Sequence, residues 1–268
     1  MKRSSMLPYI TLALVGIFLL LPIFTIGIYS FVTTWKGVLP QGFTLRYYAQ
    51  VFRDPRFTAS VIRVVSISVA PILISGTLVL LALYSSILYF PWLDKYIQSI
   101  CMLPRTMSGV IMAISALSLY AGTRTPFANR IVMLTCLYCI TILPFIYQGI
   151  RNNLHAVNIH QLIEAAEILG AGKLYAFFRI VIPNILSGIM VSALLGMSAI
   201  FTDYVVVKII AGSRYITAQQ VLYSARDQMG QYSSVIVLII FILIMVISGI
   251  SYSLKNKSSQ TKPVSTEE

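Results

Sequence analysis

Residues 158–183 read NIHQLIEAAEILGAGKLYAFFRIVIP, a mixed polar and apolar stretch that lies between two long apolar runs. Its first apolar residues recur at helical spacing, and Asn158 with Gln161 is typical of a capping box at the start of a helix. Gly170 stands where a helix ends in a left-handed residue, so a second helix is expected to start after Gly172. The stretch therefore predicts two short helices joined by a tight corner.

The same stretch contains a spaced motif: E-A-A, three residues, G, nine residues, then I-x-L-P, with Ile182 in place of the leucine. The matching residues are Glu164, Ala165, Ala166, Gly170, Ile180 and Pro183. In this motif the chain resembles the permease subunits of binding-protein-dependent ABC importers of type I. In that family the loop enters a cleft on a cytoplasmic ATPase and carries its movement into the membrane. The resemblance therefore implies that these residues couple the chain to an ATPase.

The composition indicates a membrane protein that crosses the bilayer several times. Of the 268 residues, 57% are hydrophobic and only 10% are charged, which is too little polar surface for a soluble globule. The net charge is +12, but the basic residues form no stripe with aromatic stacking platforms, so no nucleic acid is expected as a partner. Basic residues at the ends of spans are explained by their attraction to anionic headgroups of the lipid bilayer.

Six apolar runs predict an all-α integral membrane fold, with one permease domain over residues 1–254 and a flexible cytoplasmic tail at 255–268. The predicted spans are residues 7–30, 64–90, 107–121, 131–150, 184–205 and 233–254. The third span is short, and its helix begins earlier if it passes through Leu103 and Pro104. Between the first two spans, FTLRYYAQVF at 43–52 is typical of a short helix on the membrane surface. The coupling loop, residues 158–183, joins the fourth span to the fifth.

The orientation of the chain in the membrane does not follow from its charges. Six spans put both termini on the same side, and ten Lys and Arg residues then fall on each side of the membrane. The positive-inside rule therefore gives no decision. The resemblance implies that the coupling loop and both termini are cytoplasmic, in a bacterial plasma (inner) membrane.

Two features of the fifth span are candidate sites. Gly188, Ser192 and Gly196 recur at four-residue spacing, which is typical of close helix packing in lipid, against another helix or against a partner permease. Asp203 lies near the end of the span, where a carboxylate is costly in a bilayer. It either lines the substrate path and attracts a cationic group, or lies at the outer interface, solvated or paired with Lys208.

The sequence contains no convincing catalytic, nucleotide or metal site. A P-loop at 170–173 would need glycine at Glu167 and Ser or Thr at Leu174, so ATP and Mg²⁺ are expected on a separate ATPase. The candidate metal ligands are unsuitably placed: Cys136, Cys139, His155 and His160. No set of residues for nucleophilic or acid–base catalysis is present, so the chain is not expected to be an enzyme.

We therefore predict half of the translocation pathway of an ABC importer, paired with a second permease, homologous or identical, over two ATPase subunits. An extracytoplasmic binding protein would deliver a small hydrophilic solute. The stretches at 35–52 and 201–217 look like permeases of the polyamine, aminoethylphosphonate and ferric-iron branch. The alternative is a secondary transporter driven by an ion gradient, which would require charged residues within several spans or paired broken helices. A membrane-bound enzyme would require a polar catalytic cluster.

Overall fold

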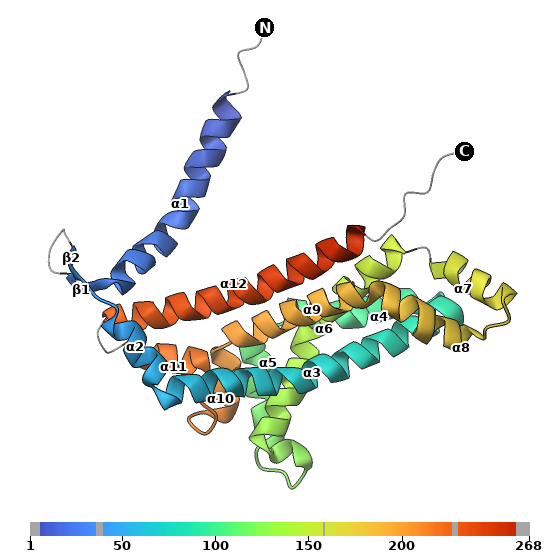
Figure 1. The fold of residues 1–268 in the computed structure, drawn as a ribbon. Helices are drawn as coiled ribbons and strands as arrows, with labels where there is room; N and C mark the ends of the chain where they lie inside the picture. The colour runs from blue at the N-terminus through green and yellow to red at the C-terminus, as the bar shows by residue number, and fades with distance from the viewer. Residues whose placement is uncertain (1–5, 36–39, 158, 227–229, 261–268) are drawn as a thin grey trace. The chain divides into compact units, whose positions relative to one another are not determined.

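Helices form almost all of the chain in a computed structural model that describes residues 6–35, 40–157, 159–226 and 230–260 (Figure 1). Apolar runs in lipid become helical because the backbone must satisfy its own hydrogen bonds where no water is present. Among the described residues, five helices are long and apolar enough to cross a membrane. The number is 6 if a bent pair of helices counts as one further span. The predicted all-α integral membrane fold is confirmed.

Contacts within the chain group it into two compact units. The first contains Met1–Ser60 and Gln220–Leu243, and the second contains Val61–Gln219 and Ile244–Glu268. The single domain expected over 1–254 is not tested by this grouping and stays a prediction.

The first unit begins with the long apolar helix α1 and a short hairpin. Its elements are α1 (Met6–Ser30), β1 (Val32–Trp35), β2 (Pro40–Phe43), α2 (Arg46–Arg53), the start of α3 (Pro55–Leu88), most of α11 (Ala218–Ala225) and the first part of α12 (Gly230–Gln260). The strands are antiparallel, with Val32 opposite Phe43. The sequence does not predict this hairpin, because strands of four residues are too short to show a clear alternation.

The second unit contains the remaining helices. They are the rest of α3, then α4 (Leu93–Met102), η1 (Leu103–Thr106), α5 (Gly109–Tyr120), η2 (Pro126–Ala128), α6 (Arg130–Ala156), α7 (Ile159–Ile168), α8 (Lys173–Ala176), η3 (Phe177–Val181), α9 (Ile182–Thr202), α10 (Val205–Ala211), the first two residues of α11 and the end of α12. The candidate membrane spans among them are Pro55–Leu88, Arg130–Leu154 and Lys173–Thr202.

Most helices are longer than the spans predicted from apolar runs. The second span was expected from residue 64, but α3 already begins at Pro55, where the Asp54 carboxylate accepts a hydrogen bond from the Arg56 amide at 2.9 Å. Proline suits the first turn of a helix and Asp suits the cap, so the helix starts before its apolar part. Likewise α12 extends to Gln260, so residues 255–260 of the predicted tail are helical. The rest of the tail, 261–268, lies outside the described residues.

The third span differs from the expected single helix at 107–121. α4 with η1 and α5 are bent by 94° at a short break, so the candidate span is a bent pair. Pro104 lies in a 3₁₀ turn, and Met107 and Ser108 adopt extended backbone before α5 begins. The helical hydrogen bonding is interrupted at these two extended residues, so the chain changes direction before α5.

The fifth span also differs from the expectation, because α8, η3 and α9 form one helical span from Lys173 to Thr202. The second helix of the predicted coupling loop is therefore not separate from the membrane span. η3 is a π-helical turn just before Pro183. Such a turn accommodates the hydrogen bond that a proline cannot make, so the chain passes Pro183 without a break.

The core of the second unit lies where α6 packs on α9. Gly188, Ser192 and Gly196 are buried in α9, and a methyl group on Gly188 would meet the Asn153 side chain of α6. A methyl group on Gly149 of α6 would likewise meet Ser192, whose Cα lies 3.3 Å from its position. Small residues on both helices thus bring the two backbones close together.

Candidate functional site

Residues 159–183 form a helical corner between the end of α6 and the start of α9 (Figure 1). α7 follows α6 after Val157, runs to Ile168, and is joined by residues 169–172 to α8, which continues into α9. Asn158, predicted as the cap of α7, lies outside the described residues. At its far end the corner continues without a break into the candidate membrane span Lys173–Thr202.

The corner depends on Gly170, which is the left-handed residue that ends α7, with φ of 82°. Its amide donates to the Glu167 carbonyl at 2.9 Å, and the Ala171 amide donates to the Ala166 carbonyl at 2.9 Å. These two bonds form a Schellman motif, which satisfies the last carbonyls of the helix and fixes the direction of the chain. A residue with a side chain is strained at this φ, so glycine has a physical reason to stand here.

α7 has one buried face and one exposed face. Ile159, Ile163 and Ala166 are buried. Glu164 and Ala165 are exposed on the other side of the helix. The three residues of the E-A-A motif thus divide between the two faces, with Ala166 packed inward and Glu164 and Ala165 available to a partner.

Two apolar residues at the tip of the corner were not predicted as site residues. Ile168 is 86% exposed and Leu169 is 87% exposed, immediately before Gly170. Large apolar side chains this exposed are typical of a contact surface when they stand together. The signal in the sequence was an apolar pair placed directly before the glycine that ends the helix.

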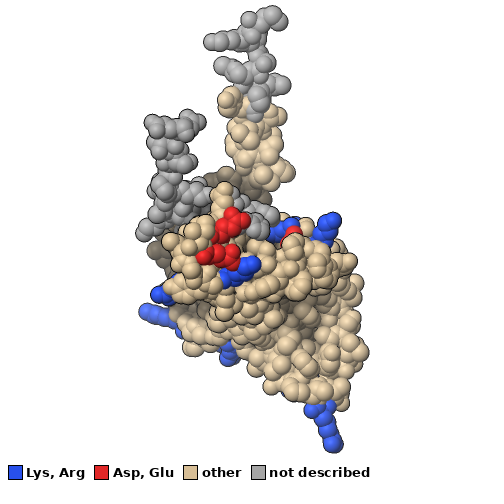
Figure 2. All heavy atoms as spheres, turned by 90° about the vertical axis from the view of Figure 1, so that its right-hand side faces the viewer, with Lys and Arg blue, Asp and Glu red and all other residues tan. Residues whose placement is uncertain are grey.

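The surface of the corner carries acidic side chains around this apolar tip. Glu164 and Glu167 are exposed, and acidic atoms gather on the face shown in Figure 2, which is the side on which α7 and α8 lie. Lys173 Nζ lies 3.8 Å from Glu167 Oε1, which links the start of α8 to α7 across the corner. An exposed pair of this kind contributes only about 0–1 kcal/mol, so the Schellman motif and packing hold the corner.

The far side of the corner is anchored in the second unit by aromatic packing. Phe177 is fully buried, and its ring centroid lies 4.9 Å from that of Tyr84 in α3. Ile180 is half-buried and Pro183 is exposed, both in the helical segment that leads into α9. These two motif residues therefore lie where the corner joins the membrane span.

Asp203 lies at the break between α9 and α10. Its Oδ2 accepts a hydrogen bond from the Tyr138 hydroxyl of α6 at 3.0 Å, and its Oδ1 accepts one from the Val206 amide at 3.2 Å. An acidic cap is favourable at the N-terminus of a helix, which explains the second bond. The predicted pairing with Lys208 is not among the ion pairs of the described residues.

A second polar contact was missed by the sequence analysis. Arg151 of α6 forms a 2.7 Å ion pair with Asp94 of α4, and its other terminal nitrogen donates to the Tyr147 hydroxyl at 2.7 Å. This contact joins α4 to the end of α6 that leads into α7. Within the described residues, no group of three His, Cys, Asp or Glu side chains is placed to hold a metal ion.

The comparison with protein families decides the class of the chain. The sequence profile of the family described as "Binding-protein-dependent transport system inner membrane component" matches residues 78–258, which is most of the chain. The chain belongs to this family. It is therefore a type I ABC importer permease, a multi-pass protein of the bacterial inner membrane, and not the secondary transporter considered as an alternative.

Curated relatives of the permease are distant. It is 25% identical over 281 residues to the "Probable ABC transporter permease protein YurN" of Bacillus subtilis, covering 92% of this chain and 95% of that one. It is 24% identical over 172 residues to the "Spermidine/putrescine transport system permease protein PotC homolog" of Mycoplasma pneumoniae, covering 63% of this chain and 59% of that one.

Solved structures of similar fold come from ABC transporters. A chain of a bacterial ABC transporter involved in the import of the acidic polysaccharide alginate has a TM-score of 0.64 at 18% identity, covering 97% of both chains. A chain of an amino acid ABC transporter solved with histidines has a TM-score of 0.53 at 16% identity, covering 80% of the permease and 99% of that chain. At these identities the likeness concerns the fold alone.

Proposed function

We propose that the permease forms half of a translocation pathway with a second permease, homologous or identical, and that the corner of α7 and α8 docks on one of two cytoplasmic ATPase subunits. The observation that carries the proposal is the exposed pair Ile168 and Leu169, held at the tip of a corner whose direction Gly170 fixes. An apolar anchor surrounded by charged side chains is the usual anatomy of a protein interface. Here the surrounding charges are Glu164 and Glu167.

The roles of the motif residues follow from their places on the corner. Glu164 and the small Ala165 face the ATPase, while Ala166 packs against the permease and keeps α7 close to it. Gly170 sets the angle. Ile180 and Pro183 lie in the continuous helix that runs from Lys173 to Thr202. Movement of the ATPase at the corner is therefore carried into α9 without a hinge between them.

The work cycle is alternating access powered by the partner subunits. ATP and Mg²⁺ bind to the ATPases, their closure carries the corner along, and the paired permeases open toward the extracytoplasmic binding protein. Hydrolysis then resets the pair. The permease itself supplies contact and movement, and no catalytic step is assigned to its residues.

For the substrate we propose a small hydrophilic solute that carries a cationic amino group, a polyamine or 2-aminoethylphosphonate. Asp203 supports this class, because its carboxylate attracts a cationic group and lies where α9 breaks. The name of the spermidine/putrescine relative agrees with it. A thermal-shift screen of the cognate binding protein checks the class: stabilisation by an anionic or uncharged solute, and by neither of these amines, contradicts it.

The docking proposal is tested by affinity purification of the tagged permease from the membranes of its own cells. We expect the wild-type chain to retain a nucleotide-hydrolysing subunit, and Gly170→Val or Glu164→Lys to lose most of it while remaining in the membrane at normal levels. Valine is strained at the φ of Gly170, which redirects the corner, and lysine reverses the charge beside the apolar tip.

Gly172→Val is the matched control for Gly170→Val. Both glycines have open space around the position of an added Cβ, but Gly172 has φ of −68° and ψ of 152°, which valine adopts readily. The control is expected to retain the ATPase. Equal retention by the Gly170 and Gly172 variants contradicts the proposed role of the corner.

A further inference from the structure

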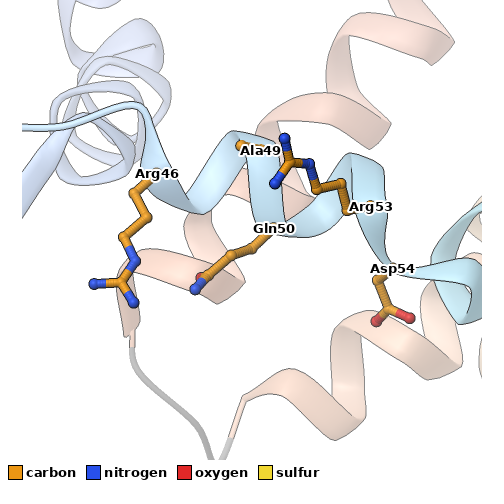
Figure 3. Close-up of a pocket in the computed structure, with 5 residues that line it drawn as sticks. All are labelled: Arg46, Ala49, Gln50, Arg53 and Asp54. Atoms are coloured by element: carbon orange, nitrogen blue, oxygen red, sulfur yellow. The ribbon is translucent and has the colours of Figure 1, made fainter.

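Helix α2 presents an exposed stripe, polar except for Ala49, that lies outside the coupling corner. Arg46, Ala49, Gln50 and Arg53 are all exposed and follow one another at helical spacing along one face. Together with Asp54 they line a pocket of about 400 Å³ (Figure 3). Arg46 and Gln50 point to the same side of α2, and the Arg53 side chain turns back along the helix toward Ala49.

The opposite face of α2 fixes the helix against the end of α1. Val51 is fully buried, and the Tyr48 hydroxyl lies 2.7 Å from the Ser30 hydroxyl in the last turn of α1. The Tyr48 ring also stacks on Phe31, with ring centroids 5.2 Å apart. The polar stripe is therefore held outward and cannot roll inward without breaking these contacts.

The length of α1 places α2 at the level of the lipid headgroups. The candidate membrane span of α1, Tyr9–Ser30, has 22 residues. At about 1.5 Å per residue this is roughly 33 Å, which matches the hydrocarbon thickness of about 30 Å. Ser30 therefore lies at the boundary between hydrocarbon and headgroups, and Tyr48 holds α2 beside it. This placement holds for either orientation of the chain in the membrane.

The two arginines of the stripe have no acidic partner among the described residues. The ion pairs of this part of the chain involve neither Arg46 nor Arg53. The Asp54 carboxylate accepts hydrogen bonds from the Arg56 amide at 2.9 Å and from the Tyr232 hydroxyl at 3.3 Å, and it forms neither of the ion pairs found among the described residues. The pocket thus combines two available guanidinium groups with an amide side chain between them.

We propose that this pocket binds the phosphate-bearing headgroup of an anionic phospholipid. Guanidinium groups match the geometry of phosphate oxygens, and Gln50 can donate a further hydrogen bond. Two exposed apolar side chains flank the stripe, Leu45 at 56% and Phe52 at 65%, and they suit the acyl chains of a lipid better than a soluble anion. The occupant is therefore a lipid and not free phosphate.

The test is thermal unfolding of the purified permease in detergent with added lipid. Phosphatidylglycerol is expected to raise the Tm of the wild-type chain, while the zwitterionic phosphatidylcholine gives a clearly smaller shift. The double variant Arg46→Gln, Arg53→Gln is expected to lose most of the phosphatidylglycerol shift and to keep its Tm without added lipid. Inorganic phosphate and glycerol phosphate are expected to give no shift.

The matched control neutralises two exposed arginines elsewhere, Arg105→Gln with Arg124→Gln. It changes the net charge of the chain by the same amount and is expected to keep the full lipid shift. An equal loss in both double variants shows a general charge effect and overturns the proposal. An equal shift with free phosphate shows a site for soluble anions and overturns it as well.

Discussion

At the scale of single residues, the hydrogen bond between Tyr138 and Asp203 joins two positions that lie 65 residues apart in the chain. The carboxylate has two donors, the Tyr138 hydroxyl and the Val206 amide, and so it both caps α10 and ties that helix to α6. A residue that could attract a cationic solute is thereby held in a fixed place before any solute arrives.

Replacing Tyr138 by phenylalanine removes one of these donors and leaves the ring. We expect the free energy of unfolding to fall by about 1 kcal/mol, the usual size of a hydrogen bond between membrane helices. Thermal unfolding in detergent measures this loss. Tyr96→Phe is the control, because Tyr96 is exposed, and it is expected to unfold at the wild-type temperature. If Tyr138→Phe also unfolds at the wild-type temperature, the hydrogen bond does not contribute to stability.

The sequence singled out Asp203 as an acidic residue near the end of a predicted span, but it did not predict the partners of this carboxylate. Reasoning from neighbouring residues offered Lys208, whereas the structure supplies a tyrosine from another helix. In the coupling loop, by contrast, the places of Glu164, Ala166 and Gly170 follow from their spacing along one short helix and its end. Contacts within one turn can be read from the sequence, and contacts between distant helices require the folded chain.

At the scale of elements, the presence of the long helices was predictable from the sequence, but the residues at which they begin and end were not. An apolar run shows where a helix meets hydrocarbon, but a helix such as α3 continues past that limit as far as its caps allow. The break between η1 and α5 and the hairpin of β1 and β2 left only weak signals, a proline and two very short strands. The small-residue ridge of α9 was visible at four-residue spacing, but its counterpart Gly149 on α6 was not.

The contact between α6 and α9 predicts a difference between two glycines. Gly149→Ala places a methyl group against Ser192, so the helices must separate, and we expect a loss of about 1–3 kcal/mol of stability. Gly76→Ala in α3 meets no atom within 4 Å and replaces glycine inside a helix, so it is expected to be neutral or stabilising by up to about 1 kcal/mol. Thermal unfolding of both variants in the same detergent compares them, and equal stability contradicts close packing at Gly149.

At the scale of the whole molecule, the charges of the chain leave its orientation open, while the proposed contact with an ATPase requires the corner of α7 and α8 to face the cytoplasm. α6 makes the orientation testable. It is a candidate span from Arg130 to Leu154, so we expect the loop before it and the corner after it on opposite sides of the membrane. This holds whether the bent pair of α4 and α5 crosses the bilayer or re-enters it.

Single cysteines at Arg124 and Lys173 report the two sides. Both positions are exposed, and the three native cysteines, Cys101, Cys136 and Cys139, are replaced by alanine so that only the introduced thiol can react. In intact cells, a membrane-impermeant maleimide is expected to label Arg124→Cys, and to label Lys173→Cys only after the membrane is opened. Labelling of Lys173→Cys in intact cells would show that the corner faces outward. Because a cytoplasmic ATPase cannot reach an outward corner, this result would also contradict the proposed coupling.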